Sequence, residues 1–305
     1  MAHANALART VLVANQKGGV WKSSIVAAVA AMVARPDRRV LVVDADQQGN
    51  VSKADLGVDG DQGRSLAMAL QYATELEPVR DIRPGLDLVA GGQFLSAINT
   101  LAGSTTGLDL AGNLAKTLAE LCDREQYALV LIDSGPGDAP VLDALLRTAR
   151  YLLIPSASDE ASLDGVGLLA RRYHLARKAG ATVSLLGVVL VAVNPRATAR
   201  NKTVLGEIAQ MLEGSGTEAF AATLRTDQAA AVDIRARHIT PAELVEANKA
   251  AKSSRLRALA GRAHVSDTLW SRDASGLASD YLDLAKEVLT RIAANEHATQ
   301  EAVQA

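Results

Sequence analysis

Two lysines and a serine near the start of the chain have the types and spacing of a phosphate-binding loop. Residues 9–24 read RTVLVANQKGGVWKSS, in which Lys22 and Ser23 follow a glycine-containing turn. The apolar run before the turn predicts a buried strand, and the Ala/Val-rich run after it predicts a helix. Backbone N–H groups of such a turn and the positive helix terminus face an anion, the lysine reaches the β- and γ-phosphates, and the hydroxyl holds Mg²⁺.

The loop departs from the usual pattern G-x-x-x-x-G-K-[ST] at two positions. Gln16 stands at the first glycine and Trp21 at the second. A tryptophan brings a Cβ and an indole to a point where the backbone must come close to the phosphates. If φ is positive there, the strain is on the order of 1–3 kcal/mol. We expect Trp21 to weaken or abolish ATP binding relative to glycine; the alternative is that the indole rotates outward and leaves the N–H groups usable.

Three carboxylates follow apolar runs that predict strands. Asp44 and Asp46 come just after one run, and Asp133 ends another. Carboxylates at the tips of neighbouring parallel strands can converge on a Mg²⁺ beside a phosphate loop, directly or through water. An aspartate after a strand is also common turn chemistry, so each taken alone leaves both interpretations open. Their occurrence together with Lys22 and Ser23 favours the metal site.

The elements that must position these residues alternate between strand and helix from end to end. This pattern predicts an α/β fold, a doubly wound and mostly parallel sheet flanked by helices, like that of P-loop nucleoside triphosphatases. The expected strands are 10–14, 39–43, 86–90, 128–132, 151–154, 183–193 and 219–224, and the expected helices are 22–35, 65–76, 94–101, 108–121, 139–150, 162–179, 202–212 and 277–292.

The composition predicts one domain over residues 1–305, with flexible termini at 1–8 and 294–305. The formal charge of −2 gives no global sign of nucleic-acid binding, so a basic surface must be local. Cys122 is the single cysteine, which excludes a disulfide framework and favours a reducing, cytoplasmic setting. No apolar run reaches the ~18 residues that span a bilayer. Trp270 is expected to pack beneath the C-terminal helix.

Five segments resemble the ParA/MinD ATPase superfamily, and within it the ParA partition ATPases. Lys17-Gly18-Gly19-x-x-Lys22-Ser23 resembles the deviant Walker A motif K-G-G-x-G-K-[ST]. The segments after the second and central strands, DADQQGN and LIDSGPG, resemble D-x-D-P-Q-G-N and L-I-D-x-P-P. Residues 155–165 and the C-terminal YLDLAKEVLTRI are also similar to family segments. The resemblance covers roughly residues 9–292.

The resemblance implies roles for individual residues. Lys17 would cross a dimer interface to the partner's nucleotide, Lys22 would contact the β- and γ-phosphates, and Asp46 would orient the attacking water. Ser23 would bind Mg²⁺, with Asp133 supporting it through water and Asp44 as a further metal-site candidate. The residues expected to contact ATP are Lys17, Gly18, Gly19, Val20, Trp21, Lys22, Ser23 and Ser24 in the loop, with Asn194 and Arg225, on looser matches, at the base.

One segment near the C-terminus is basic and contains no acidic residue. Its cations lie at roughly helical spacing, which makes a stripe suited to phosphate backbones without base readout. The alternative is a solvated helix face. Because ParA dimers bind DNA non-specifically through C-terminal basic patches, the resemblance favours DNA. The candidate residues are Lys249, Lys252, Arg255, Arg257 and Arg262.

The leading interpretation is a cytoplasmic, nucleoid-associated partition ATPase with ATP and Mg²⁺ as cofactors. ATP would join two copies, the homodimer would bind DNA non-specifically, and a ParB-like centromere-binding protein would stimulate hydrolysis. The alternatives are a non-hydrolysing, nucleotide-poor scaffold and a ParA relative that positions other cellular machinery. The tail after residue 292 lacks the basic amphipathic helix of a membrane-binding relative, so no membrane partner is expected.

Overall fold

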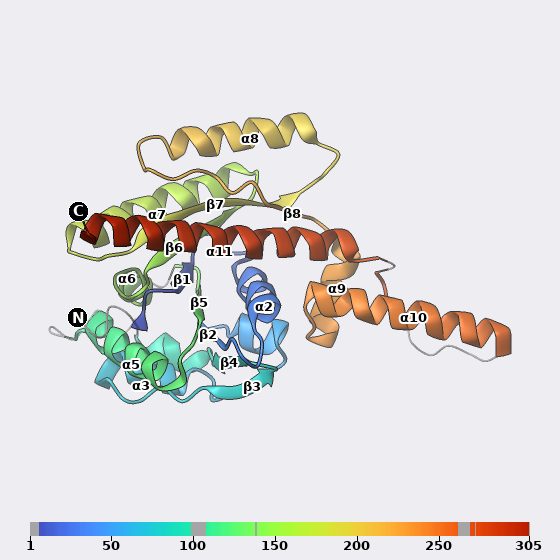
Figure 1. Ribbon diagram of the computed structural model, residues 1–305, viewed down its shortest axis with the longest axis horizontal. Coiled ribbons are helices and arrows are strands. Elements are labelled where there is room, and N and C mark those ends of the chain that lie inside the picture. Colours follow the sequence, from blue (N-terminus) through green and yellow to red (C-terminus); the bar gives the residue numbers. More distant parts are fainter. Residues whose placement is uncertain (1–5, 99–107, 138, 262–268, 272, 305) are drawn as a thin grey trace.

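A single eight-stranded sheet forms the centre of the computed structural model, which describes residues 6–98, 108–137, 139–261, 269–271 and 273–304 (Figure 1). The strand order is β3-β4-β2-β5-β1-β6-β7-β8, and every pairing is parallel except that of β3 with β4. The strands are β1 (Thr10–Val13), β2 (Val40–Ala45), β3 (Val79–Arg83), β4 (Leu86–Val89), β5 (Leu129–Ser134), β6 (Tyr151–Ser156), β7 (Ser184–Val193) and β8 (Thr223–Arg225).

Helices cover both faces of this sheet, which confirms the predicted doubly wound α/β fold. One face carries α3 (Arg64–Tyr72), α5 (Leu110–Glu125), α6 (Ala139–Thr148), α7 (Glu160–Lys178) and α8 (Thr198–Met211). The other face carries α2 (Lys22–Val33), α9 (Gln228–Arg237), α10 (Pro241–Gly261) and α11 (Ser275–Gln304). Two short elements, a π-helical turn η1 (Asn50–Asp55) and a 3₁₀ turn η2 (Gln93–Leu95), follow β2 and β4.

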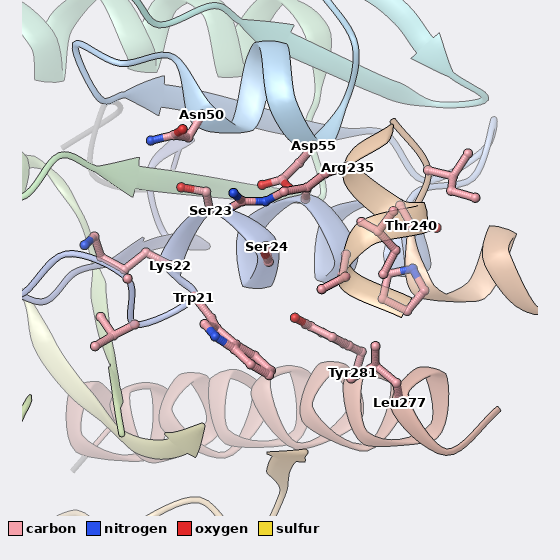
Figure 2. Close-up of a pocket in the computed structure, with 18 of the residues that line it drawn as sticks. Trp21, Lys22, Ser23, Ser24, Asn50, Asp55, Arg235, Thr240, Leu277 and Tyr281 are labelled. Carbon is pink, nitrogen blue, oxygen red and sulfur yellow. The ribbon is translucent and has the colours of Figure 1, made fainter. Parts of the chain in front are cut away.

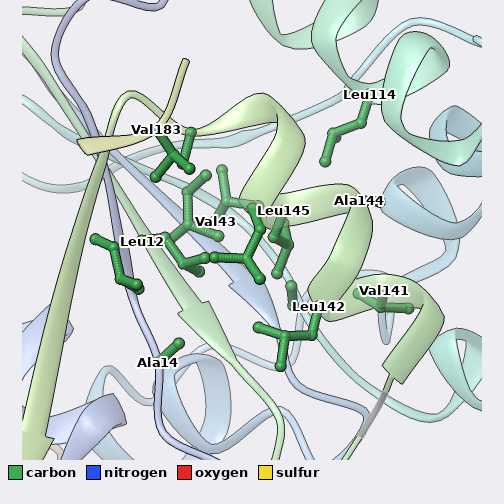
Figure 3. Packing of buried hydrophobic residues seen from close by; sticks show 14 of the residues in the cluster. Leu12, Ala14, Val43, Leu114, Val141, Leu142, Ala144, Leu145 and Val183 are labelled. Atoms are coloured by element: carbon green, nitrogen blue, oxygen red, sulfur yellow. The ribbon is translucent and has the colours of Figure 1, made fainter. Parts of the chain in front are cut away.

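The alternation of side chains along β1 explains why the sheet has two cores. Leu12 and Ala14 point into the cluster beneath α5 and α6, where Leu114 and Leu145 also pack (Figure 3). Val11 and Val13 point into the opposite cluster, which includes Ile25 of α2 and Leu284 of α11. All four β1 positions are buried, as expected for a central parallel strand covered on both faces. The strand is thus fixed from both sides, and so is the loop that leaves it.

Helix α11 lies along the sheet and holds its β7–β8 side. Glu287 accepts hydrogen bonds from the backbone N–H groups of Ala221 and Ala222, at 3.0 and 2.9 Å. Arg291 donates to the Leu186 and Glu218 carbonyl oxygens, both at 2.8 Å, and lies 4.0 Å from the centre of a phenylalanine ring. Residues 294–304, expected as a flexible terminus, continue this helix, and Glu296 pairs with Arg9 at 2.6 Å.

Several elements differ from the sequence predictions. Strand β3 was missed because it is a largely exposed antiparallel edge strand and therefore lacks an apolar run. The predicted helix 94–101 begins instead as η2, and its last three residues lie outside the described part of the chain. Helix α9 and the part of α10 before the basic segment, residues 241–248, were not predicted. The expected packing of Trp270 is wrong, since this side chain is 75% exposed. Within the described ranges, no helix has both the length and the apolarity needed to cross a membrane.

Candidate nucleotide site

The loop between β1 and α2 forms an open cradle at the carboxyl end of the sheet. Gly19 has φ +77°, a conformation that glycine adopts without penalty. A Cβ built at Gly18 or at Gly19 would meet no atom within 4 Å, so the space above both residues is free. Val20 is buried and anchors the loop in the core. The loop therefore presents its backbone to a pocket.

Trp21 takes the left-handed conformation at the residue that precedes α2. Its φ and ψ are 61° and 19°, a region that costs a non-glycine residue on the order of 1–2 kcal/mol. The indole points toward α11, while the Lys22 side chain extends in another direction (Figure 2). The ring is half-buried and packs against the core cluster that contains Leu277 and Tyr281. The strain foreseen for a positive φ is thus present, and the indole does not lie over the lysine.

Lys22, Ser23 and Asp133 form the centre of the site. The Ser23 hydroxyl donates to Asp133 Oδ2 at 2.7 Å, and Lys22 Nζ donates to the Lys17 carbonyl oxygen at 3.0 Å. Burial raises the pKa of Asp133 well above its ordinary value, with a further contribution from the charge of Asp44. Burial likewise lowers the pKa of Lys22. Phosphates would stabilise the charged lysine, and a cation would stabilise the carboxylate.

The register of the parallel sheet brings the other two carboxylates to the same edge. Asp44 of β2 is the direct partner of Asp133 on β5. Asp44 accepts from the backbone N–H and hydroxyl of Ser52 at 2.9 and 2.7 Å, and this fixes η1 to the strand. Burial raises its pKa to about 6. Asp46 accepts from Gln48 N–H and from the Asn50 amide, at 2.9 and 3.1 Å, and lines the pocket, whereas Asp44 does not.

The protein oxygen atoms at the site fit a Mg²⁺ ion that takes most of its ligands from a substrate and water. Asp133 Oδ1 is buried without a hydrogen-bond partner, an orphaned acceptor beside the Ser23 hydroxyl. Among the described residues, no three His, Cys, Asp or Glu side chains gather in a way that would hold a metal ion. Mg²⁺ usually takes one or two protein oxygens together with phosphate oxygens and water. Ser23 and Asp133 match that preference.

Lys17 is held by its own chain in this structure. Its Nζ contacts the Asp159 carboxylate and the Ser162 hydroxyl, the latter at 3.0 Å. The hydrogen bond from Lys17 lowers the pKa of Asp159, which also caps α7. Asn15, which sequence reasoning missed, accepts from Lys17 N–H at 2.9 Å. A Cβ at Gly165 would come within 2.3 Å of the Asn15 side-chain oxygen, so glycine allows α7 to approach the loop.

The two residues expected at the base lie apart from the cradle. Arg225 makes a two-pronged ion pair with Asp280, at 2.7 and 2.8 Å, which joins β8 to α11. Asn194 is exposed and accepts from the backbone N–H of Arg196 at 3.0 Å. Neither Asn194 nor Arg225 lines the pocket at the loop.

The basic segment belongs largely to α10, which projects from the body of the molecule (Figure 1). Lys249 and Lys252 are exposed and Arg255 is half-buried. Lys249 pairs with Glu246 at 2.7 Å, so an acidic neighbour just outside the segment partly neutralises the stripe. The side chain of Arg257 and the whole of Arg262 lie outside the described part of the chain.

The pocket beside the loop has a volume of about 510 Å³ and is lined in part by residues that sequence reasoning missed. Residues of the loop, Lys22, Ser23, Ser24 and Asp46 line one part. Asp55, Arg235 and Tyr281 line another, and they come from η1, α9 and α11. No local motif marks these three, because only the fold brings them together. Tyr281 falls within the predicted helix 277–292, but the sequence gave no reason to assign it to a pocket.

The buried carboxyl of Asp55 leads to a prediction about pH. Burial raises its pKa from 3.8 to about 6, against the opposing charges of Arg235 and His238 and with a contribution from Asp44. The folded state therefore binds the proton more tightly, and this stabilisation is lost as pH rises from about 4 to 6. Asp55→Asn should raise the free energy of unfolding at pH 8 by about 1–3 kcal/mol and give no gain at pH 4.

Urea denaturation at the two pH values measures this effect. Asp59→Asn, in the exposed turn nearby, is the matched control and should change stability at neither pH. An equal loss of stability at both pH values in Asp55→Asn would contradict the prediction.

Comparisons with known proteins agree with this arrangement. A family model described as "AAA domain" matches residues 8–183. The chromosome-partitioning ATPase Soj of Thermus thermophilus is 33% identical over 189 residues, which are 62% of this chain and 71% of Soj. The chromosome partitioning protein ParA of Caulobacter vibrioides is 29% identical over 194 residues, 62% of this chain and 71% of that protein.

Two solved structures share the fold. A cobyrinic acid a,c-diamide synthase from Mycobacterium smegmatis, with bound ADP and magnesium, is 26% identical, with a TM-score of 0.60 over 75% of this chain and 92% of that one. The structure of pNOB8 ParA bound to nonspecific DNA is 19% identical, with a TM-score of 0.60 over 93% and 98%. Since the family model spans more than half of the chain, and Soj is 33% identical over 71% of its own length, the chain belongs to the ParA family of partition ATPases.

Proposed function

We propose that the protein is itself an ATP hydrolase of the partition type, dependent on Mg²⁺. The observation that carries the proposal is the hydrogen bond between Ser23 and Asp133 at the start of α2, beside the buried amine of Lys22. This arrangement provides a hydroxyl, an acceptor oxygen and a cation where a triphosphate would meet the loop. The bound ADP and magnesium of the structural neighbour from Mycobacterium support the same ligand here.

The residues of the chain suit in-line attack of water on the γ-phosphate. Lys22 and the N–H groups of the loop stabilise charge on the phosphate oxygens, and Asp46 orients the attacking water. The hydrogen bonds from Gln48 and Asn50 hold the Asp46 carboxylate toward the pocket. Ser23, with Asp133 behind it, would hold Mg²⁺, which would supply positive charge to the phosphate oxygens. Asp44 contributes indirectly, because its hydrogen bonds with Ser52 fix η1 to β2.

We further propose that ATP joins two copies, with each Lys17 reaching the nucleotide of the other. Lys17 already lies at the edge of the loop and is about one-third exposed. To cross an interface it must leave Asp159 and Ser162, and a triphosphate offers a stronger negative charge than one carboxylate. The dimer would then bind DNA without sequence preference through α10, associate with the nucleoid, and respond to a ParB-like partner. The DNA-bound pNOB8 ParA shares the fold that this proposal requires.

A non-hydrolysing scaffold remains the second candidate, because Trp21 occupies the left-handed position where the family has glycine. That candidate predicts a protein that adopts the fold and binds ATP poorly or not at all. Direct measurement of hydrolysis separates the two.

Removing the loop lysine tests the hydrolase proposal. Lys22→Ala should lower the rate of phosphate release from ATP by about 100-fold or more, because no other buried cation faces the phosphates among the described residues that line the loop side of the pocket. Lys116→Ala, an exposed lysine of α5, is the control and should keep the wild-type rate. A wild-type protein without hydrolysis, at a purity that excludes contaminants, would favour the scaffold.

Reversing a charge on α10 tests the DNA proposal. Lys252→Glu should weaken ATP-dependent binding to unrelated DNA duplexes about equally, and should reduce the slope of log affinity against log salt by about 1. Fluorescence anisotropy over a salt series measures both. Lys116→Glu makes the same charge change on the opposite face and should bind as the wild type does; an equal loss there would contradict the assignment to α10.

Replacing Trp21 by glycine tests its expected effect on the phosphates. We propose that the Cβ of Trp21 keeps the phosphates from the closest approach to the loop. Trp21→Gly should therefore bind inorganic tripolyphosphate with Mg²⁺ about tenfold more tightly, the gain of roughly 1.5 kcal/mol expected from one further hydrogen bond to a charged group. Titration calorimetry measures the affinity. Unchanged affinity would mean that Trp21 leaves the phosphate cradle intact.

A further inference from the structure

The pocket continues well beyond the residues that would hold phosphates. From Lys22 and Ser24 it extends along α2 to α9, to the start of α10 and to α11. This second section, which we term the inner section, is predominantly apolar. It is lined by Ala27, Ala28, Val232, Ile234, Ile239 and Leu277, together with Trp21 and Tyr281. A triphosphate would bind such an apolar surface poorly, because its charged oxygens would lose their hydration there.

Two aromatic side chains face the inner section. The left-handed backbone of Trp21 directs its indole toward α11, and Figure 2 shows the Tyr281 hydroxyl pointing from α11 into the same space. The Tyr281 ring is only 3% exposed and Trp21 packs against its cluster. Flat, apolar surfaces of this kind bind the faces of nucleic-acid bases by stacking.

Polar groups without partners gather at the far end. One carboxylate oxygen of Asp55, a residue only 4% exposed, has no hydrogen-bond partner. Tyr281 and Asp55 line the same pocket, and within the described residues the Tyr281 hydroxyl makes no hydrogen bond. Burial raises the pKa of Tyr281, and the charge of Asp55 adds to this shift. A few polar groups at the end of an apolar pocket are typical of a site that orients a flat heterocycle.

Asn194 and Arg225, the two residues that the resemblance assigns to the base, have other partners in this structure. Arg225 forms an ion pair with Asp280, and the Asn194 side chain accepts a hydrogen bond from the backbone N–H of Arg196. Neither reaches the pocket, whereas the inner section adjoins the phosphate cradle directly.

We propose that the inner section holds the base of a purine nucleotide, with Trp21 as its stacking surface and with Tyr281 and Asp55 facing the polar edge of the base. This inference rests on the proposed binding of ATP by the loop. In it Trp21 has two opposite effects: it hinders the phosphates and it binds the base. A purine is favoured over a pyrimidine because its two rings cover more of the indole.

Comparing ATP with inorganic tripolyphosphate isolates the contribution of the base. Titration calorimetry with the full chain and Mg²⁺ should show that the wild type binds ATP at least about tenfold more tightly than tripolyphosphate. Trp21→Gly, which suits the left-handed backbone, should lower this ratio about tenfold, while tripolyphosphate binding confirms that the variant is folded. Trp21→Phe should keep most of the ratio. Tyr281→Phe, which retains the ring, should lower it only a few-fold.

Trp270→Gly, which removes an exposed tryptophan that does not line the pocket, is the matched control, and its ratio should equal that of the wild type. A wild-type ratio near one, an unchanged ratio in Trp21→Gly, or an equal fall in Trp270→Gly would each overturn the base assignment while leaving phosphate binding in place. Loss of the ratio in Asn194→Ala, at the residue that the resemblance assigns to the base, would also overturn it. If neither ATP nor tripolyphosphate binds the wild type, the proposed ATPase function itself fails.

Discussion

The hydrogen bond between Ser23 and Asp133 joins the start of α2 to the end of β5, and the site depends on it. It forms because the parallel register sets β1 beside β5, with Val13 opposite Asp133, so that the loop leaving one strand turns back over the tip of the other. The same register pairs Asp44 with Asp133. The carboxylates of Asp44 and Asp133 thereby meet at one buried edge of the sheet, where burial and the charges of neighbouring carboxylates raise the pKa of both.

Much of this arrangement could be predicted from the sequence because it is local. A strand, a turn containing Gly18 and Gly19, and Lys22 at the head of a helix are adjacent in the chain, so the cradle follows from short-range patterns. The order of strands and helices fixed the fold class for the same reason. Asp133 was found because it ends an apolar run.

What the sequence could not show comes from segments far apart in the chain. Asp55, Arg235 and Tyr281 share one pocket only because η1, α9 and α11 meet over α2. The commitment of Arg225 to Asp280 is equally invisible without the fold, and Trp270 was misplaced because an aromatic residue near an amphipathic helix usually packs against it. Trp21 was predictable only in part. Its strained backbone followed from the local motif, but the direction of its indole depends on α11, which is far away in the chain.

Helix α10 reaches from the wall of the pocket to a point away from the body of the molecule. Its first turn, at Pro241, forms part of the pocket wall, together with Ile239 and Thr240 just before it, and its far end stands away from the body of the molecule (Figure 1). With 21 residues it is roughly 30 Å long. A tilt of about 10° at the pocket wall would therefore carry the tip through roughly 5 Å, a displacement comparable to the spacing between neighbouring phosphates of a nucleic-acid strand. A shift at the pocket too small to alter the fold would still be enlarged along the helix, to about 3 Å at Lys252, which lies halfway along it.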